Sequence, residues 1–154
     1  MPGIWIEGGR QAALVVHPDG ADAARRSPAV RELLGKRASV LLIDAFQTGT
    51  ASAPRDRSVK HFDAFNQTED ACRAQDILTA LAFLKQSGYS DVRLVGIGKA
   101  AVWALFAAAV AATPVSLDAD LDGFSGTDSE FAAGFFVPGI QRAGGLRAAK
   151  LLVK

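Results

Sequence analysis

The chain has 154 residues, of which 49% are hydrophobic, and it carries 17 basic against 16 acidic side chains. This size and hydrophobic content fit one folded domain spanning residues 1–154. The balanced charge excludes the basic surface typical of nucleic-acid-binding proteins, so no nucleic-acid partner is expected. The longest apolar run, Ala100–Ala112, is shorter than the roughly 20 residues that span a bilayer, which argues against a membrane partner.

Cysteine content and the start of the chain indicate the compartment. Cys72 is the sole cysteine, which excludes an intrachain disulfide and thiolate metal clusters. The first residues lack the basic and apolar regions of a signal peptide. We therefore expect a cytoplasmic protein that needs no cofactor and holds no metal.

Five segments are predicted to be strands. Two are continuous apolar runs typical of strands buried on both faces, a third is apolar except for Arg93, and the last alternates apolar and polar residues. The predicted strands are Ile4–Glu7, Ala12–Val16, Val40–Ile43, Val92–Val95 and Val115–Asp122.

Four helices are predicted between and after these strands. Ser27 and Thr68 are the kind of residue that caps a helix, and Pro28 suits a first helical position. The predicted helices run from the Ser27 cap to about Leu34, from the Thr68 cap to Gly88, and over Lys99–Ala112 and Leu146–Val153, while Gln47–Asn66 is predicted to be a long loop.

The alternation of strands and helices predicts an α/β fold. We expect a three-layer α/β/α sandwich around a mainly parallel five-stranded sheet. The expected order of strands in space, each named by one residue, is Ile4, Val40, Leu14, Val92, Val115. The last strand would then form an exposed edge, through which a homodimer or a contact with a neighbouring domain could form.

The turn Gly96-Ile97-Gly98-Lys99-Ala100 joins a buried strand to an apolar helix and is the most informative segment. It fits a nucleophile elbow, Gly-x-Ser-x-Gly, in which glycine has replaced the serine at Gly98. Without a hydroxyl there, acyl transfer through a serine ester cannot begin. The predicted catalytic set is therefore empty, with Gly98 as a degenerate nucleophile position.

The same turn also fits two other interpretations. Gly96, Gly98 and Ala101 match the dinucleotide fingerprint, and Asp118 and Asp120 follow at about the distance of its acidic residue. The turn could equally be structural, since glycine adopts unusual backbone angles at low cost.

Several segments, in this order, resemble the α/β-hydrolase superfamily, and within it the acetyl-xylan-esterase-like and dienelactone-hydrolase-like proteins. The similar segments are Ala13–Gly20, Ser39–Gly49, Phe65–Thr68 with Arg73 and Gln75–Leu84, the elbow itself, Asp120–Phe124, Phe136–Ile140 and Gly144–Leu146. The resemblance implies that the sheet is part of an α/β-hydrolase fold and that Ala13–Gly20 contains the strand and loop that help form an oxyanion hole. It also implies a catalytic order of serine, acid and histidine.

That chemistry does not carry over to this chain. The family's nucleophile falls on Gly98, and both histidines, His17 and His61, precede the elbow. Our first hypothesis is a catalytically degenerate hydrolase-fold protein that binds a small molecule or a partner. The alternatives are an active carboxylic or acetyl ester hydrolase whose triad is completed elsewhere, and a nucleotide-binding module at Gly96–Ala101.

Ligand-binding candidates gather at the predicted carboxyl ends of the strands. His17 ends a strand, where α/β folds place ligands, although backbone groups could equally satisfy its ring. Lys99 begins a helix whose N-terminus attracts anions. Alternation places Asp118, Asp120 and Asp122 on one side of a strand, more often a surface than a cation site. The ligand-binding candidates are His17, Asp19, Gly96, Gly98, Lys99 and Asp122.

Overall fold

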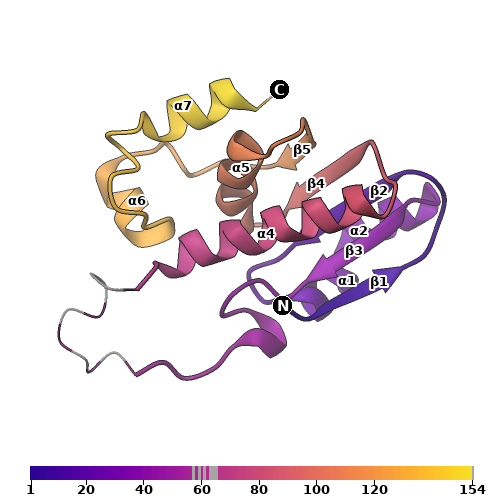
Figure 1. Ribbon diagram of the computed structural model, residues 1–154, viewed down its shortest axis with the longest axis horizontal. Helices are drawn as coiled ribbons and strands as arrows, with labels where there is room; N and C mark the ends of the chain where they lie inside the picture. The colour runs from indigo at the N-terminus through magenta and orange to yellow at the C-terminus, as the bar shows by residue number, and fades with distance from the viewer. Residues whose placement is uncertain (57, 59, 61, 63–65, 154) are drawn as a thin grey trace.

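The computed structural model describes residues 1–56, 58, 60, 62 and 66–153 (Figure 1). His61 and Phe65, both considered above, lie outside the described residues. The strands are β1 (Gly3–Ile6), β2 (Ala12–Val16), β3 (Ser39–Ile43), β4 (Val92–Gly96) and β5 (Ser116–Ala119). The helices are α1 (Ala21–Arg26), α2 (Pro28–Gly35), the 3-10 helix η1 (Gly49–Ala51), α4 (Glu69–Gln86), α5 (Ala100–Val110), α6 (Asp128–Gly134) and α7 (Gly145–Leu152).

The five strands form one sheet in the order β1-β3-β2-β4-β5, which confirms the predicted strand order and places β5 at an edge. The sheet is mixed, however, and the prediction of a mainly parallel sheet is wrong. Strand β1 runs antiparallel to β3, with Gly3 opposite Ile43 and Ile6 opposite Val40. The other three pairings are parallel.

The direction of β1 follows from its connection to β2. Parallel neighbours need a crossover of about a dozen residues or more, usually a helix. The link between Ile6 and Ala12 is far shorter and contains the turn residues Gly8 and Gly9. The chain therefore reverses its direction between β1 and β2, so that β1 runs antiparallel both to β2 and to β3, which lies between them.

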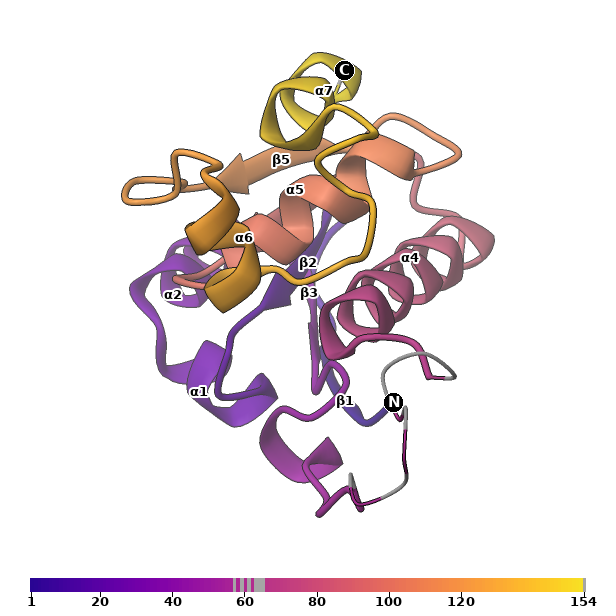
Figure 2. The same ribbon diagram turned by 90° about the vertical axis from the view of Figure 1, so that its left-hand side faces the viewer.

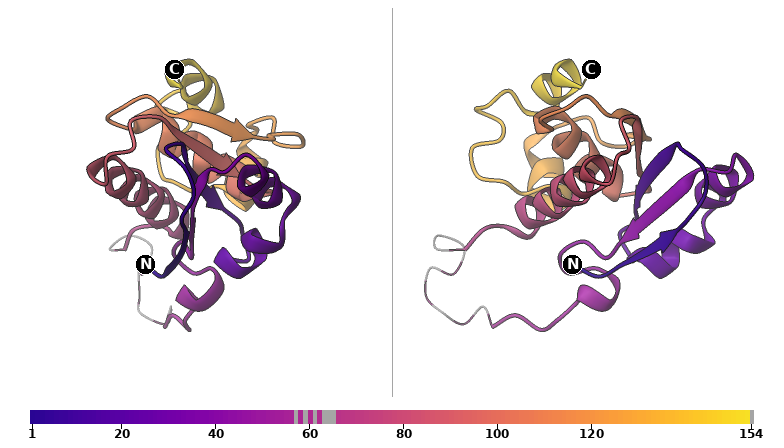
Figure 3. Two further views of the ribbon diagram at one scale, coloured as in Figure 1. Left: turned by 90° about the vertical axis from the view of Figure 1, so that its right-hand side faces the viewer. Right: turned by 45° about the vertical axis from the view of Figure 1, so that its right-hand side comes forward.

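Helices cover both faces of the sheet (Figure 2). On one face α1 and α2 pack against the side chains of Ala13, Val15, Val40 and Leu42. On the other face α4 and α5 pack against the alternate residues, among them Leu14 and Leu94, and α6 and α7 add Phe131, Phe135 and Ala149 to that core. Figure 3 shows the molecule from the opposite side, again with α1 and α2 (purple) on one face of the sheet and α4 (magenta) on the other.

The predicted helix starts are confirmed where a local side chain caps the helix. The Ser27 hydroxyl accepts from the Val30 amide with Pro28 in the first turn, and the Thr68 hydroxyl accepts from the Ala71 amide. Helix α5 is buried from Ala100 to Ala108, as its apolar sequence predicts. Within the described residues, no helix is both long and apolar enough to cross a membrane.

Three helical elements and one strand end differ from the predictions. Helices α1 and α6 were not predicted, the 3-10 helix η1 lies within the predicted loop Gln47–Asn66, and β5 stops at Ala119 instead of continuing to Asp122. Asp120 ends the strand because its Oδ1 accepts from the Asp122 amide at 2.9 Å, which closes a local turn. The three aspartates at 118, 120 and 122 therefore do not share one face of a strand.

Candidate functional site

The elbow turn is shaped by a close approach between strand β4 and helix α5. A Cβ atom on Gly96 would lie 2.6 Å from the Cα of Ala101 and 2.8 Å from the Cβ of Ala104. Such distances are too short for any side chain, so the helix can pack this tightly only because residue 96 is glycine. Gly96 is buried beneath the helix.

Gly98 has the opposite surroundings. Its φ of +55° lies in the left-handed region, which favours glycine. A Cβ atom there would have a single neighbour within 4 Å outside the adjoining residues, the Pro18 Cγ at 4.0 Å. The turn therefore projects residue 98 into open space, as an elbow projects its nucleophile, but it carries no side chain to use that space.

A pocket of about 310 Å³, which we name the elbow pocket, opens on this turn. It lies between the start of α5, the loop after β5 and helix α6. It is lined by Gly98, Lys99, Val102, Asp120, Leu121, Asp122, Gly123, Phe124, Glu130, Ala133 and Gly134. Of the predicted ligand-binding residues, the pocket thus brings together Gly98, Lys99 and Asp122.

His17 and Asp19 lie outside the elbow pocket, in the loop after β2. The His17 Nδ1 accepts from the Asp19 amide at 3.0 Å, and the Asp19 carboxylate is 3.8 Å from the same nitrogen. The ring is thus held by its own loop, which matches the structural interpretation of His17. Pro18, between these two residues, is the one that faces Gly98.

Asp44 organises the loops that flank the elbow and is not available to a ligand. It is 4% exposed, and its carboxylate accepts from the Ala21 amide at 2.6 Å and from the amide and hydroxyl of Thr50. Burial opposes ionisation, but these hydrogen bonds outweigh it and lower the pKa of Asp44. Gly20 and Gly49 leave room for the carboxylate, since a Cβ on either would clash with it. Asp44 therefore holds the loop after β2 against the loop after β3.

Helix α6 forms the wall opposite the elbow and is fixed at both ends. Thr127 and Glu130 form a reciprocal capping box at its start. Hydrogen bonds from the Thr127 amide and hydroxyl and from Ser125 lower the pKa of Glu130 to about 2. At its other end, the Phe135 ring stacks on Phe106 of α5, with ring centroids 4.3 Å apart. The pocket wall is thus part of the core.

Sequence reasoning missed Glu130 and Phe124 as lining residues. The Thr127-x-x-Glu130 spacing is a capping-box signature, so α6 had a detectable signal. Phe124 carries no such signal, because only the turn after β5 brings it against α6, where it contacts Phe131 and lies beside Gly134.

A second pocket, of about 380 Å³, lies across α6 from the first, and Ala133 borders both. Its charged residues pair with one another. The Arg73 guanidinium stacks over the Trp103 ring and donates to Asp70 and Glu69 at 2.9 and 3.0 Å. Because these groups satisfy one another, we assign this cluster to holding α4 against α5.

The described residues contain no group of three or more His, Cys, Asp or Glu side chains placed to hold a metal ion. No family model matches the chain, and no curated protein is significantly similar to it in sequence.

Proposed function

We propose that this chain is a catalytically degenerate α/β-hydrolase-like protein, related to acetyl-xylan esterases, that binds a small molecule in the elbow pocket. One observation carries the proposal. The pocket opens directly on Gly98, the position where an esterase would hold its nucleophile, and residue 98 has no hydroxyl. The site therefore has a cavity that a small molecule could occupy, but residue 98 cannot carry out acyl transfer.

The elbow architecture supports the relationship to hydrolases. The turn follows an inner strand of the sheet, its first glycine allows the helix to pack closely, and its third residue faces open space. The strand order agrees with the one we expected for a partial hydrolase fold. Pro18, in the segment that resembles the oxyanion-hole loop, borders residue 98.

The size of the pocket favours a small ligand. A volume of about 310 Å³ lies at the lower end of the range of roughly 300–1,000 Å³ that ligand pockets occupy. A dinucleotide is too large for it, which makes the nucleotide-binding alternative weaker. The position at the carboxyl ends of parallel strands is where open α/β sheets bind ligands.

The test is a fragment-binding experiment on the whole chain, read as amide chemical-shift changes in NMR spectra. The mixture should contain neutral, anionic and cationic fragments, with AMP and NAD as further probes. We expect shifts centred on Gly98, Lys99 and Leu121–Phe124. No saturable binding in this region by any fragment would overturn the proposal, and preferential binding of AMP or NAD would favour the nucleotide alternative.

Helix α6 offers a matched pair of variants. Ala132 and Ala133 are adjacent and exposed, but only Ala133 lines the elbow pocket. Ala133→Phe should fill the pocket and abolish fragment binding, whereas Ala132→Phe should leave it unchanged. Equal losses in both variants would place the binding outside this pocket.

A further inference from the structure

The charges around the elbow pocket are unequal. Lys99 supplies one ammonium group, whereas Asp120, Asp122 and Glu130 supply three carboxylates, which leaves a net negative charge of two. A concave site with an excess of one sign of charge concentrates ligands of the opposite sign. The pocket charges therefore oppose an anionic ligand, despite Lys99 and the helix N-terminus behind it.

The Glu130 carboxylate keeps its charge at neutral pH. It accepts hydrogen bonds from the Ser125 and Thr127 hydroxyls at 2.8 Å each, as well as from their amides, and its pKa is about 2. These bonds also fix its position at the start of α6. The negative side of the pocket is thus preorganised.

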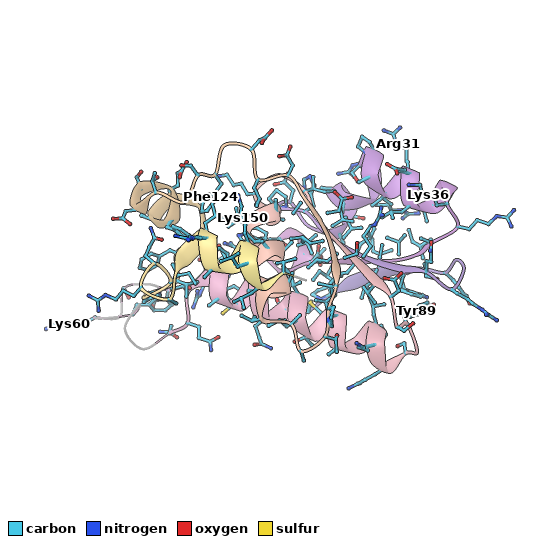
Figure 4. The ribbon with its side chains drawn as sticks, turned by 90° about the horizontal axis from the view of Figure 1, so that it is seen from above. Arg31, Lys36, Lys60, Tyr89, Phe124 and Lys150 are labelled. Atoms are coloured by element: carbon cyan, nitrogen blue, oxygen red, sulfur yellow. The ribbon has the colours of Figure 1, made fainter. Side chains whose placement is uncertain are left out.

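The remaining surface is mainly apolar and includes an aromatic ring. Val102, Leu121 and Phe124 line the pocket. The Phe124 ring packs edge-to-face against Phe131, with centroids 5.1 Å apart, so its orientation is set by the core. In Figure 4 Phe124 lies in the other half of the molecule from Tyr89 and Lys36. Aromatic rings and carboxylates together are the surroundings that organic ammonium groups prefer.

We propose that the ligand of the elbow pocket is a small organic cation. Its ammonium head would lie toward the side of the pocket that carries Asp120, Asp122 and Glu130, and its apolar body against Phe124 and Val102. This inference rests on the proposed function, since it assigns a chemical class to the ligand of the same pocket.

Three probes of similar shape separate charge from size. Choline carries a trimethylammonium group, 3,3-dimethylbutan-1-ol is its neutral counterpart, and 3,3-dimethylbutanoate is an anion of similar size. We expect NMR titrations to give choline a Kd about threefold lower than the alcohol's, the gain expected for an exposed cation–aromatic site, with the anion weakest. Raising the salt concentration should weaken choline binding and leave the alcohol unchanged.

Two substitutions in the pocket should change the affinity for choline in opposite directions. Relative to binding of the alcohol, Asp122→Asn should weaken choline binding about two- to threefold, and Lys99→Gln should strengthen it by a similar factor. Asp91→Asn is the control, because Asp91 is an exposed acid beside the first residue of β4, at the other end of the strand.

The outcomes separate this inference from the proposed function. Binding of the alcohol or the anion as tightly as choline, with the same sensitivity to Ala133→Phe, would overturn the cationic ligand and keep the pocket. No binding by these probes or by any fragment in the mixture would overturn both.

Discussion

The Cβ atom that Gly98 lacks would lie 4.0 Å from the Cγ of Pro18. This spacing is ordinary van der Waals contact, so the surroundings leave room for a side chain at residue 98. The backbone sets the restriction, because φ is +55°. Under our proposal this turn is a nucleophile elbow without a nucleophile, and a side chain placed there should test its shape.

Gly98→Cys should give a folded protein with a reactive thiol. We expect a destabilisation of about 1 kcal/mol from the left-handed backbone. The new thiol should react quickly with iodoacetamide, because the N-terminus of α5 and the Lys99 ammonium favour the thiolate. Cys72 supplies the contrast, since burial raises the pKa of its thiol.

The measurement is the alkylation rate by mass spectrometry, with Gly98→Cys made in a Cys72→Ser background and the parent chain as the reference for Cys72. Protection of the new thiol by a fragment that binds the elbow pocket would place it at the pocket's opening. A new thiol that alkylates no faster than Cys72 of the parent chain would contradict the elbow geometry.

Gly96→Ala should destabilise the protein, because the added methyl group would meet the Ala101 Cα at 2.6 Å. Overpacking of this kind costs about 1–3 kcal/mol. Urea unfolding followed by circular dichroism measures the change. Gly35→Ala is the control: nothing lies within 4 Å of its Cβ position, so its effect should be neutral or slightly stabilising. Equal effects at the two sites would show that β4 and α5 are not in close contact.

Asp44→Asn should destabilise the fold by about 1–3 kcal/mol at pH 7, because the amide cannot accept from all the donors that surround the carboxylate. The pKa of Asp44 is lowered in the folded protein, so its ionised form adds stability above the ordinary value of 3.8. That stability is lost as the pH falls from 3.8 through the lower folded pKa.

Urea unfolding at a series of pH values from neutral down into the acid range of this titration tests the dependence. The parent should lose stability faster than Asp44→Asn at the acidic end, so that the two curves converge. Asp91→Asn, an exposed substitution, should follow the parent throughout. Parallel curves for the parent and Asp44→Asn would refute the assigned role.

Thr127→Ala should loosen helix α6 by removing its capping box, at a cost of about 1 kcal/mol. Hydrogen exchange should then become several-fold faster at the Phe131 and Phe135 amides, while β4 keeps its protection. Thr79→Ala is a suitable control, because that exposed threonine lies within α4 and caps no helix. Unchanged exchange in α6 would mean that Phe131 and Phe135 alone hold the helix.

The sequence predicted those elements whose determinants are local. Buried strands are visible as apolar runs, and the Ser27 and Thr68 caps act on amides three residues away. Helix α1 has no such local signal. Its N-cap is Gly20, which has no side chain to accept a hydrogen bond, and the Ala21 amide donates instead to Asp44, 23 residues later in the chain. The direction of β1 was predictable from the short link to β2, but the apolar pattern alone did not give it.

Only the part of the candidate site that is contiguous in the sequence was predicted. The elbow glycines and Lys99 are contiguous in the sequence, whereas Phe124 and Glu130 reach the pocket through the turn after β5 and through α6. His17 satisfies its ring within its own loop, which a strand-end position does not reveal.

The most direct test of the central claim is p-nitrophenyl acetate hydrolysis by the purified chain, with and without a serine-directed phosphonylating reagent. We expect no turnover that the reagent abolishes, because residue 98 has no hydroxyl to acylate. Multiple turnovers abolished by that reagent would contradict the degenerate elbow and would favour an active esterase with its nucleophile elsewhere in the chain.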